Sequence, residues 1–298
     1  MKKVLMLSMV LLSALVAQAQ LKVFPTLKKG FAKTYVTTNT FDIPMQGSVV
    51  LTDETTYTVS ETTADGYVID MLTTTITSDI PEGSIAGQIL AASMEIAKGI
   101  NIKLSTDKNG SVTAIKNYEE VRKALDTRCD EMVEKLNKLI PQLSTVFTKE
   151  ALKQQLMENL AEQRLLASIK NDHGPLSLFG KTIMTGAQET FVNQQGLQLK
   201  RMYFVSGKNV TTSESLDMNK EDIKKLIIAQ IEKMAPAQAD MVKENIDQLM
   251  ESGMLKMDVK STATYEFDDN CWVKAIQSEA TTEAAGQATT TKSKVVCK

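Results

Sequence analysis

Residues 31–78 read FAKTYVTTNTFDIPMQGSVVLTDETTYTVSETTADGYVIDMLTTTITS, and this stretch decides the class of fold. Its three runs are rich in Thr, Val and Tyr, which are residue types favoured in strands. Turn residues separate the runs at Pro44–Gly47 and Ala64–Gly66. Short turns join neighbouring strands antiparallel, so the stretch predicts a three-stranded antiparallel meander.

The rest of the chain extends this pattern on both sides of a helical middle. We expect helices at 85–98, 118–139, 148–169 and 219–251, and strands at 100–106, 111–116, 181–193, 197–218, 255–267, 272–278 and 287–296. Hairpins dominate this order, and no alternation of strand and helix is long enough for a parallel sheet. The sequence therefore predicts an α+β fold, in which helices cover a curved, half-barrel-like antiparallel sheet.

The domain organisation follows from the same order of elements. We expect a signal peptide at 1–19 and a single α+β domain at 20–298. Within it, two similar β-rich halves, 20–117 and 181–298, would flank the helical middle, 118–170. Both halves place a turn before Val and Lys, at Asp107–Gly110 and Asp268–Asn270. Hairpins in general prefer these turn residues, which explains the similarity as well as two related halves do, so both explanations stay open.

The first residues have the features of a cleavable export signal. Lys2 and Lys3 precede an apolar run, Val4–Val16, that is short for a membrane span. A small-x-small pattern ends at Ala19, which predicts cleavage between Ala19 and Gln20. No cysteine stands there to accept a lipid. We expect a protein of the periplasm or the cell exterior, most consistent with a Gram-negative bacterium.

The composition argues against two classes of partner. The chain has 34 Lys and Arg against 36 Asp and Glu, and its formal charge of −2 gives no attraction to nucleic acid. After the signal, no segment reaches the roughly 18 consecutive apolar residues of a spanning helix, so no integral membrane segment is predicted.

The three cysteines divide into a predicted pair and a single thiol. Cys271 and Cys297 flank a hairpin whose turn would centre near Ala284, placing them opposite each other. An exported compartment permits the disulfide that this predicts. Two reduced thiols, or a slipped register, are the alternatives. Cys129 lies in a helical pattern and is interpreted as an inert, half-buried thiol.

The sequence contains no recognisable catalytic or metal-binding pattern. His173 is the only histidine, and it precedes Gly174 and Pro175, which predicts a surface turn. A second histidine, a Cys-x-x-Cys pair and a Gly-x-Ser-x-Gly elbow are all missing. Ser105–Gly110 lacks the acidic end positions of a calcium loop and is expected to be a hairpin turn, as is Asp268–Asn270. We therefore predict no catalytic residue, metal ligand or cofactor site.

Three segments carry a resemblance to known proteins. They are Lys29–Tyr35, the hairpin from Ile102 to Gly110 that leads to Asn117–Val121, and the hairpin Tyr265–Val273. In these segments the chain resembles a group of exported bacterial proteins of unknown function. Its architecture is also similar to the periplasmic lipoprotein-carrier half-barrels, whose curved sheet and helices enclose a lipid-binding cavity. That second resemblance is one of topology, and it transfers no ligand-contact residue to this chain.

These features lead to three functional hypotheses. The first is a cell-envelope protein that binds a lipid or another apolar ligand between sheet and helices. Methionines near the predicted helix at 219–251, such as Met250 and Met257, would suit such a pocket or simply fill the core. The second is a ligand-free structural or interaction module with an envelope protein as its partner. The third is a hydrolase with an unrecognised site, so an enzyme is not the prediction.

Native mass spectrometry of the protein from its own host tests the first two hypotheses together with the cleavage. We expect the mass of a chain that begins at Gln20, accompanied by a bound lipid. A clean ligand-free mass would favour the interaction module, and a mass that includes Met1–Ala19 would contradict the cleavage.

Overall fold

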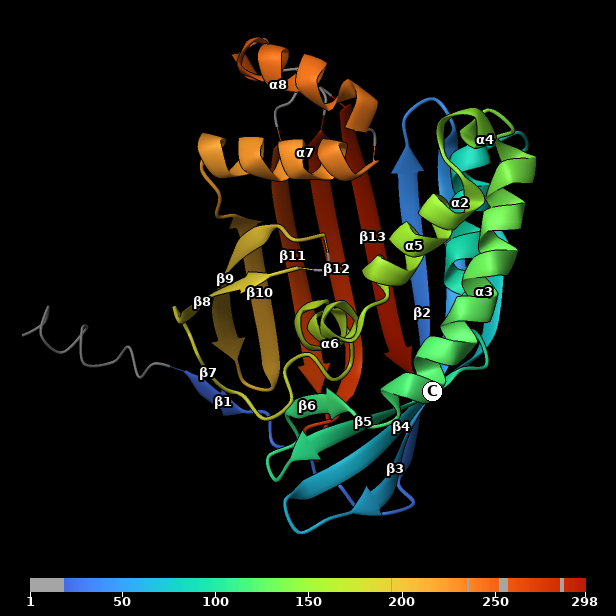
Figure 1. Cartoon of the computed structure of the whole chain (residues 1–298). Coiled ribbons are helices and arrows are strands. Elements are labelled where there is room, and N and C mark those ends of the chain that lie inside the picture. The colour runs from blue at the N-terminus through green and yellow to red at the C-terminus, as the bar shows by residue number, and fades with distance from the viewer. Residues whose placement is uncertain (1–18, 194, 235, 252–256, 285–286) are drawn as a thin grey trace, which may run out of the picture.

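The computed structural model describes residues 19–193, 195–234, 236–251, 257–284 and 287–298. Within these ranges, eleven strands form one open, curved antiparallel sheet (Figure 1). The amino-terminal strands are β2 (Ala32–Ile43), β3 (Gly47–Thr62), β4 (Gly66–Asp79), β5 (Asn101–Asp107) and β6 (Val112–Ile115). The carboxy-terminal strands are β8 (Gln188–Val192), β9 (Gln198–Ser206), β10 (Asn209–Leu216), β11 (Met257–Phe267), β12 (Val273–Ala284) and β13 (Gln287–Cys297).

The strand order is β6-β5-β4-β3-β2-β13-β12-β11-β10-β9-β8, so the sheet consists of two meanders. They join where β2 pairs antiparallel with β13, with Val36 opposite Val296. The Tyr35 hydroxyl strengthens this junction, because it donates a buried hydrogen bond of 2.9 Å to the carbonyl oxygen of Val273. A short ribbon of β1 (Gln20–Lys22) and β7 (Thr182–Met184) lies apart from the large sheet.

The helices form two groups, and one further helix, α6, lies apart from both. Their bounds are α2 (Ile85–Glu95), α3 (Tyr118–Leu139), α4 (Leu143–Val146), α5 (Lys149–Asn159), α6 (Glu162–Asn171), α7 (Lys220–Met234) and α8 (Pro236–Glu251). Figure 1 shows α2 to α5 beside the amino-terminal strands, α6 in front of β11 and β12, and α7 and α8 at the top of the carboxy-terminal strands. The protein is thus of the α+β class.

Alternation along the strands builds the core. Strand β3 buries residues that are separated by even numbers of positions, as expected when one face of a strand meets other elements. These residues are Val49, Leu51, Tyr57 and Val59. Tyr57 and Val59 belong to the main hydrophobic cluster, in which helix α3 buries Val121, Leu125 and Met132. A second cluster under α7 contains Leu197, Leu199 and Val259, with Leu226 of α7 packed against it.

Part of the main hydrophobic cluster consists of aromatic side chains around Trp272. Trp272 is completely buried, and its ring lies 5.3 Å from that of Phe31 and 5.2 Å from that of Phe179, measured between centroids. Its indole N–H donates a hydrogen bond to the carbonyl oxygen of Thr26 at 3.3 Å. The one tryptophan of the chain therefore joins segments from both ends and the middle of the sequence.

The element bounds confirm most of the predicted strands and helices and correct others. The expected strand 197–218 is the hairpin of β9 and β10, and the helix expected at 148–169 is divided into α5 and α6 at Leu160. Pro236 begins α8, as its preference for the first helical turn predicts. Strand β1 of the short ribbon was not predicted, because three residues are too few to show the alternation of apolar and polar side chains that marks a strand.

The two acidic loops are turns, as predicted. The Asp107 carboxylate accepts hydrogen bonds from the backbone N–H groups of Asn109 and Ser111, each at 2.9 Å. The Asp268 carboxylate accepts bonds from the N–H groups of Asn270 and Trp272, at 2.8 and 2.9 Å. The two halves thus use the same side-chain-to-backbone turn.

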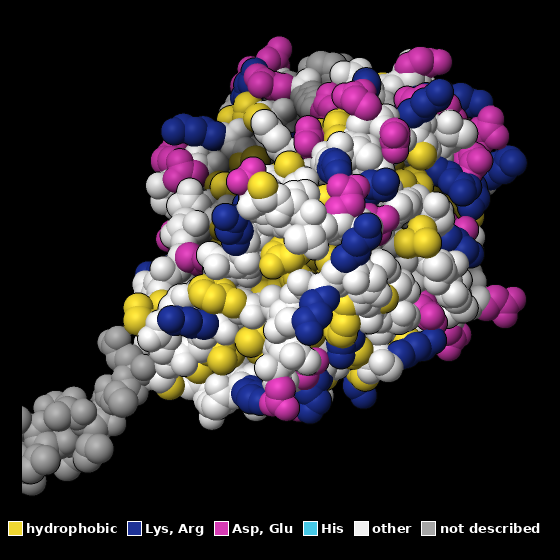
Figure 2. Space-filling model, turned by 90° about the horizontal axis from the view of Figure 1, so that it is seen from below, with side chains coloured by type: hydrophobic (Ala, Val, Ile, Leu, Met, Phe, Trp, Pro, Cys, Tyr) yellow, Lys and Arg dark blue, Asp and Glu magenta, His cyan; other side chains and the backbone are white. Residues whose placement is uncertain are grey.

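The surface seen from below mixes both signs of charge. In Figure 2, Lys and Arg side chains alternate with Asp and Glu, and hydrophobic side chains lie between them. This face therefore carries no patch of a single charge sign. Among the helices that the structure describes, none combines the length and the apolar character needed to cross a membrane.

Helix α2 lies directly on the sheet because Gly87 has no side chain. A β-carbon at this position would come within 2.7 Å of methyl groups of both Ile80 and Val49. Ser84 caps the helix, accepting a hydrogen bond from the N–H of Gly87 at 3.1 Å. The close approach fixes the height of α2 above β3 and β4.

Gly87→Ala should therefore lower the free energy of unfolding by about 1–2 kcal/mol, because overpacking outweighs the better helix propensity of alanine. Urea denaturation measures the change. Gly174→Ala is the matched control, since a β-carbon there meets nothing within 4 Å. Equal stability of the two variants would show that α2 does not depend on this contact.

Candidate functional site

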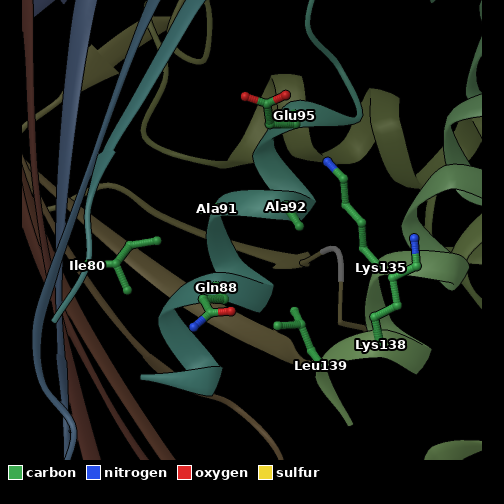
Figure 3. Close-up of a pocket in the computed structure, with 8 residues that line it drawn as sticks. All are labelled: Ile80, Gln88, Ala91, Ala92, Glu95, Lys135, Lys138 and Leu139. Atoms are coloured by element: carbon green, nitrogen blue, oxygen red, sulfur yellow. The ribbon is translucent and has the colours of Figure 1, made fainter. Parts of the chain in front are cut away.

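A groove lies between helices α2 and α3, and we call it the α2–α3 groove. Its volume is about 510 Å³. Figure 3 shows its eight lining residues, which come from the residue after β4, one side of α2 and the last turns of α3: Ile80, Gln88, Ala91, Ala92, Glu95, Lys135, Lys138 and Leu139. The volume falls within the range of pockets that hold small ligands.

The groove has an apolar floor. Ile80, Ala92 and Leu139 supply aliphatic surface, and Figure 3 shows Ile80 and Leu139 on opposite sides of α2. Toward the end of α2 there is a separate small hollow of about 20 Å³, whose lining includes the buried residues Ile96 and Met132.

Two lysines lie at the rim of the groove. Lys135 and Lys138 are exposed, and no ion pair among the described residues involves either of them. Figure 3 shows Lys135 extending from α3 toward Glu95 of α2, whose carboxylate contacts Lys98 at 3.9 Å. An aliphatic floor with free ammonium groups at its edge suits a ligand with an apolar chain and an anionic head.

A line of polar side chains runs across the carboxy-terminal strands, from β8 to β11. Glu189 of β8 lies opposite Arg201 of β9, which lies opposite Glu214 of β10, and Ser261 of β11 continues the line. We call these four residues the ionic row. The Arg201 side chain is fully buried, and its guanidinium carbon lies 4.3 Å from the centroid of the Phe191 ring.

Arg201 makes three kinds of contact within the row. Its Nε donates to Glu214 at 2.6 Å, and one terminal nitrogen donates to Glu189 at 3.0 Å. The other terminal nitrogen donates to the backbone carbonyl oxygen of Asn171, at the end of α6. The guanidinium thereby ties α6 to the sheet while it neutralises two carboxylates.

His173 belongs to this region, and the prediction of a surface turn was wrong. Its side chain is only 15% exposed, and Nε2 lies 2.8 Å from the Ser261 hydroxyl and 3.5 Å from a Glu214 oxygen. Nδ1 lies 3.0 Å from the hydroxyl of Tyr265, which is itself buried. The Gly174–Pro175 sequence does end the helix, but the turn folds back onto β11.

The environment sets the charge of these groups. Burial alone would raise the pKa of Glu214, but the hydrogen bond and charge of His173 and the Arg201 guanidinium hold it below its ordinary value. Burial opposes ionisation of Glu189 as well, and hydrogen bonds from Tyr203 and Lys181 lower its pKa. Burial raises the pKa of Tyr265 to about 12, so this phenol is neutral at physiological pH.

The arrangement differs from that of a serine hydrolase. In a catalytic triad, a carboxylate holds Nδ1 of the histidine while the serine contacts Nε2. Here a neutral phenol faces Nδ1, and Glu214 and Ser261 both lie at Nε2. The ionic row and His173 together connect α6 and the turn after it to the carboxy-terminal strands.

The predicted disulfide is not formed in this structure. The three cysteines are free thiols, with Cys129 buried. Ala275 of β12 is paired with Val296 of β13, and extending this register places Lys274, three residues after Cys271, opposite Cys297. The register of β12 against β13 therefore differs by three residues from the predicted one. Cys271 instead lies in the loop before β12, where its thiol contacts the carbonyl oxygen of Lys22 at 3.5 Å.

Other predicted residues have mixed outcomes. Residues 1–18 lie outside the described part of the chain, whereas Gln20 begins β1 and lies opposite Met184. Of the methionines considered for a ligand pocket, Met257 packs against the second hydrophobic cluster. Among the described residues, no group of three or more His, Cys, Asp or Glu is placed to hold a metal ion.

Comparisons with known proteins place the chain in no family. No family model and no curated protein matches it. A solved structure described as lipid–protein interactions in lipovitellin has a TM-score of 0.38 and 8% identity, over 92% of this chain and 25% of that chain. A porin-like protein from Bacteroides uniformis has a TM-score of 0.21 and 9% identity, over 92% and 99% of the two chains.

Removing Arg201 should be strongly destabilising. Arg201→Met leaves Glu189 and Glu214 without their buried partner, and we expect a loss of about 3–5 kcal/mol in the free energy of unfolding. Adding Glu189→Met and Glu214→Met should recover part of the loss. Arg122→Met, an exposed arginine on α3, is the control and should change stability by less than about 0.5 kcal/mol. A small effect of Arg201→Met alone would contradict a structural role for the ionic row.

The lowered pKa of Glu214 gives a dependence on pH. Because the folded-state pKa lies below that of the unfolded chain, the carboxylate stabilises the fold above about pH 4.3. This contribution fades as the pH falls through the folded-state pKa. We therefore expect Glu214→Gln to be less stable than the wild type at neutral pH, with a difference that narrows in acid. Thermal unfolding between pH 3 and pH 7 measures it, and a constant difference would count against the assignment.

Proposed function

We propose that this protein binds an apolar ligand with an anionic head, such as a fatty acid, in the α2–α3 groove. The observation that carries the proposal is the combination of an aliphatic floor with two rim lysines that lack ion-pair partners among the described residues. The acyl chain would lie along Ile80, Ala92 and Leu139. Its carboxylate would lie at Lys135 and Lys138, where water also reaches it.

The energetics of such a complex are modest and measurable. Burial of about eight methylene groups contributes roughly 6 kcal/mol, at about 0.8 kcal/mol for each group. An exposed ion pair with lysine adds about 0.2–1 kcal/mol. These terms sum to about 7 kcal/mol before the cost of association is subtracted, so the dissociation constant should be no tighter than about 10 μM. Such an affinity suits a carrier that must release its ligand.

The proposal includes the cellular setting. The Lys2–Lys3 start, the apolar run and the Ala19–Gln20 junction support export to the periplasm or the cell exterior. There a soluble acyl-binding protein would shield its ligand from water. The helices would act as a partial cover over the curved sheet, and α2 and α3 would form the ligand-binding part of that cover.

Ala92→Trp tests the apolar part of the site, because the larger ring would occupy the floor of the groove. With 11-(dansylamino)undecanoic acid as the fluorescent probe, we expect the affinity to fall at least about tenfold, a loss of about 1.4 kcal/mol. Ala97→Trp, an exposed position beyond the end of α2, is the control and should bind as the wild type does. Thermal unfolding confirms that both variants are folded. Unchanged affinity in Ala92→Trp would place the probe elsewhere.

Lys135→Gln with Lys138→Gln tests the anionic head. Competition of decanoate against the probe should weaken by roughly two- to tenfold, since each exposed ion pair contributes little. Competition by decanol, which has no charge, should stay the same. Lys123→Gln, on the exposed side of the same helix, serves as the matched control. An equal effect on decanoate and decanol would contradict the role of the lysines.

A further inference from the structure

The loop between β2 and β3 presents an exposed hydrophobic residue in an unfavourable backbone conformation. Met45 is 98% exposed, and its φ angle is +62°. Side chains other than glycine, asparagine and aspartate rarely adopt this region. Ile85, the first residue of α2, is also exposed, at 45%. We call Met45 and Ile85 the apolar tip.

Hydrogen bonds hold the two residues at one end of the molecule. The Gln46 side-chain oxygen accepts bonds from the Ser84 hydroxyl and from the N–H of Ala86, both at 3.2 Å. These two partners lie on either side of Ile85 in the sequence. The loop is therefore fixed to the start of α2, and Figure 1 shows it rising at the top of the structure beside α4.

The apolar tip adjoins the α2–α3 groove. A β-carbon on Gly47 would lie 3.3 Å from the ring of Pro81, which follows the groove residue Ile80 in the chain. Along α2, Gln88 lines the groove one turn after Ile85. The tip is therefore next to the end of the groove that Ile80 and Gln88 line.

Size and charge indicate what the tip contacts. Two side chains are far too few for a stable protein interface, which needs at least about 1,000 Å² of total buried surface. They are enough to enter the outer part of a lipid layer. The charged residues nearest in sequence, Asp42, Asp79 and Glu82, are all acidic and outnumber the two rim lysines of the groove, so an anionic surface gains no net electrostatic attraction here.

We propose that the apolar tip inserts into a zwitterionic lipid surface and transfers an acyl ligand from it into the α2–α3 groove. This inference rests on the proposed function of the groove. The methionine side chain enters the acyl boundary while the acidic residues stay in the headgroup region. Ligand then moves along Ile80 without crossing bulk water.

The test is the rate of probe uptake from phosphatidylcholine vesicles that contain 11-(dansylamino)undecanoic acid. Transfer during collision makes the rate rise in proportion to the vesicle concentration, whereas transfer through water is limited by release of the probe. We expect the first behaviour for the wild type. Met45→Asn with Ile85→Gln keeps the turn, since asparagine tolerates positive φ. This variant should lose the dependence, and its uptake should slow by about tenfold or more. Val192→Thr, another exposed apolar position, is the control.

Two further measurements separate this inference from the proposed function. The tip variant should bind the probe in aqueous solution as tightly as the wild type, because the groove is intact. Without any probe, the wild type should raise the surface pressure of a phosphatidylcholine monolayer more than the variant does. Failure of the wild type to bind the probe in solution would overturn the proposed function. Equal uptake and equal surface pressure for wild type and variant would overturn the role of the tip, as would stronger insertion into anionic phosphatidylserine monolayers.

Discussion

The pairing of β2 with β13 is the interaction on which the rest of the structure depends. It joins two meanders that would otherwise each end in an exposed edge strand, and the Tyr35–Val273 hydrogen bond connects residues 238 positions apart. Because β3 pairs with β2, this junction also sets the position of Val49, against which α2 rests at Gly87. The groove and the apolar tip both follow from where α2 lies.

The two halves of the sheet meet their helices by different means. The amino-terminal half uses close apolar packing, with Gly87 against Ile80 and Val49. The carboxy-terminal half meets α7 by apolar packing too, but it meets α6 through charge, since Arg201 binds Glu189, Glu214 and the end of α6. A buried network of this kind specifies one arrangement of strands, because any shift in register leaves a buried charge unpaired. Apolar packing tolerates an opening between α2 and α3, and this is where the groove lies.

The sequence predicts the local elements well and the long-range contacts poorly. Turn residues and period locate most strands, and Asp107 and Asp268 form the expected turns. His173 illustrates the limit: its partners Ser261 and Tyr265 follow 88 and 92 residues later, and no local pattern reports them. The Cys271–Cys297 prediction failed because a small shift of the turn moves the register by three residues.

The same distinction applies to the candidate site. Its residues come from separate helices, and Ile80 and Leu139 are ordinary apolar residues within their own segments. Only the crossing of α2 and α3 brings them together, so spacing alone could not identify them. The ionic row was likewise not predicted, because Glu189, Arg201 and Glu214 are single charges on three different strands, and only the register places them side by side.

Binding in the groove can be measured residue by residue with methyl NMR of the isotopically labelled protein during titration with decanoate. We expect saturable shifts of the Ile80, Ala92 and Leu139 methyl signals, with a common dissociation constant no tighter than about 10 μM. Val259 in the second hydrophobic cluster should stay unchanged. Shifts confined to methyl groups away from α2 and α3, or no saturable shift at all, would contradict binding in the groove.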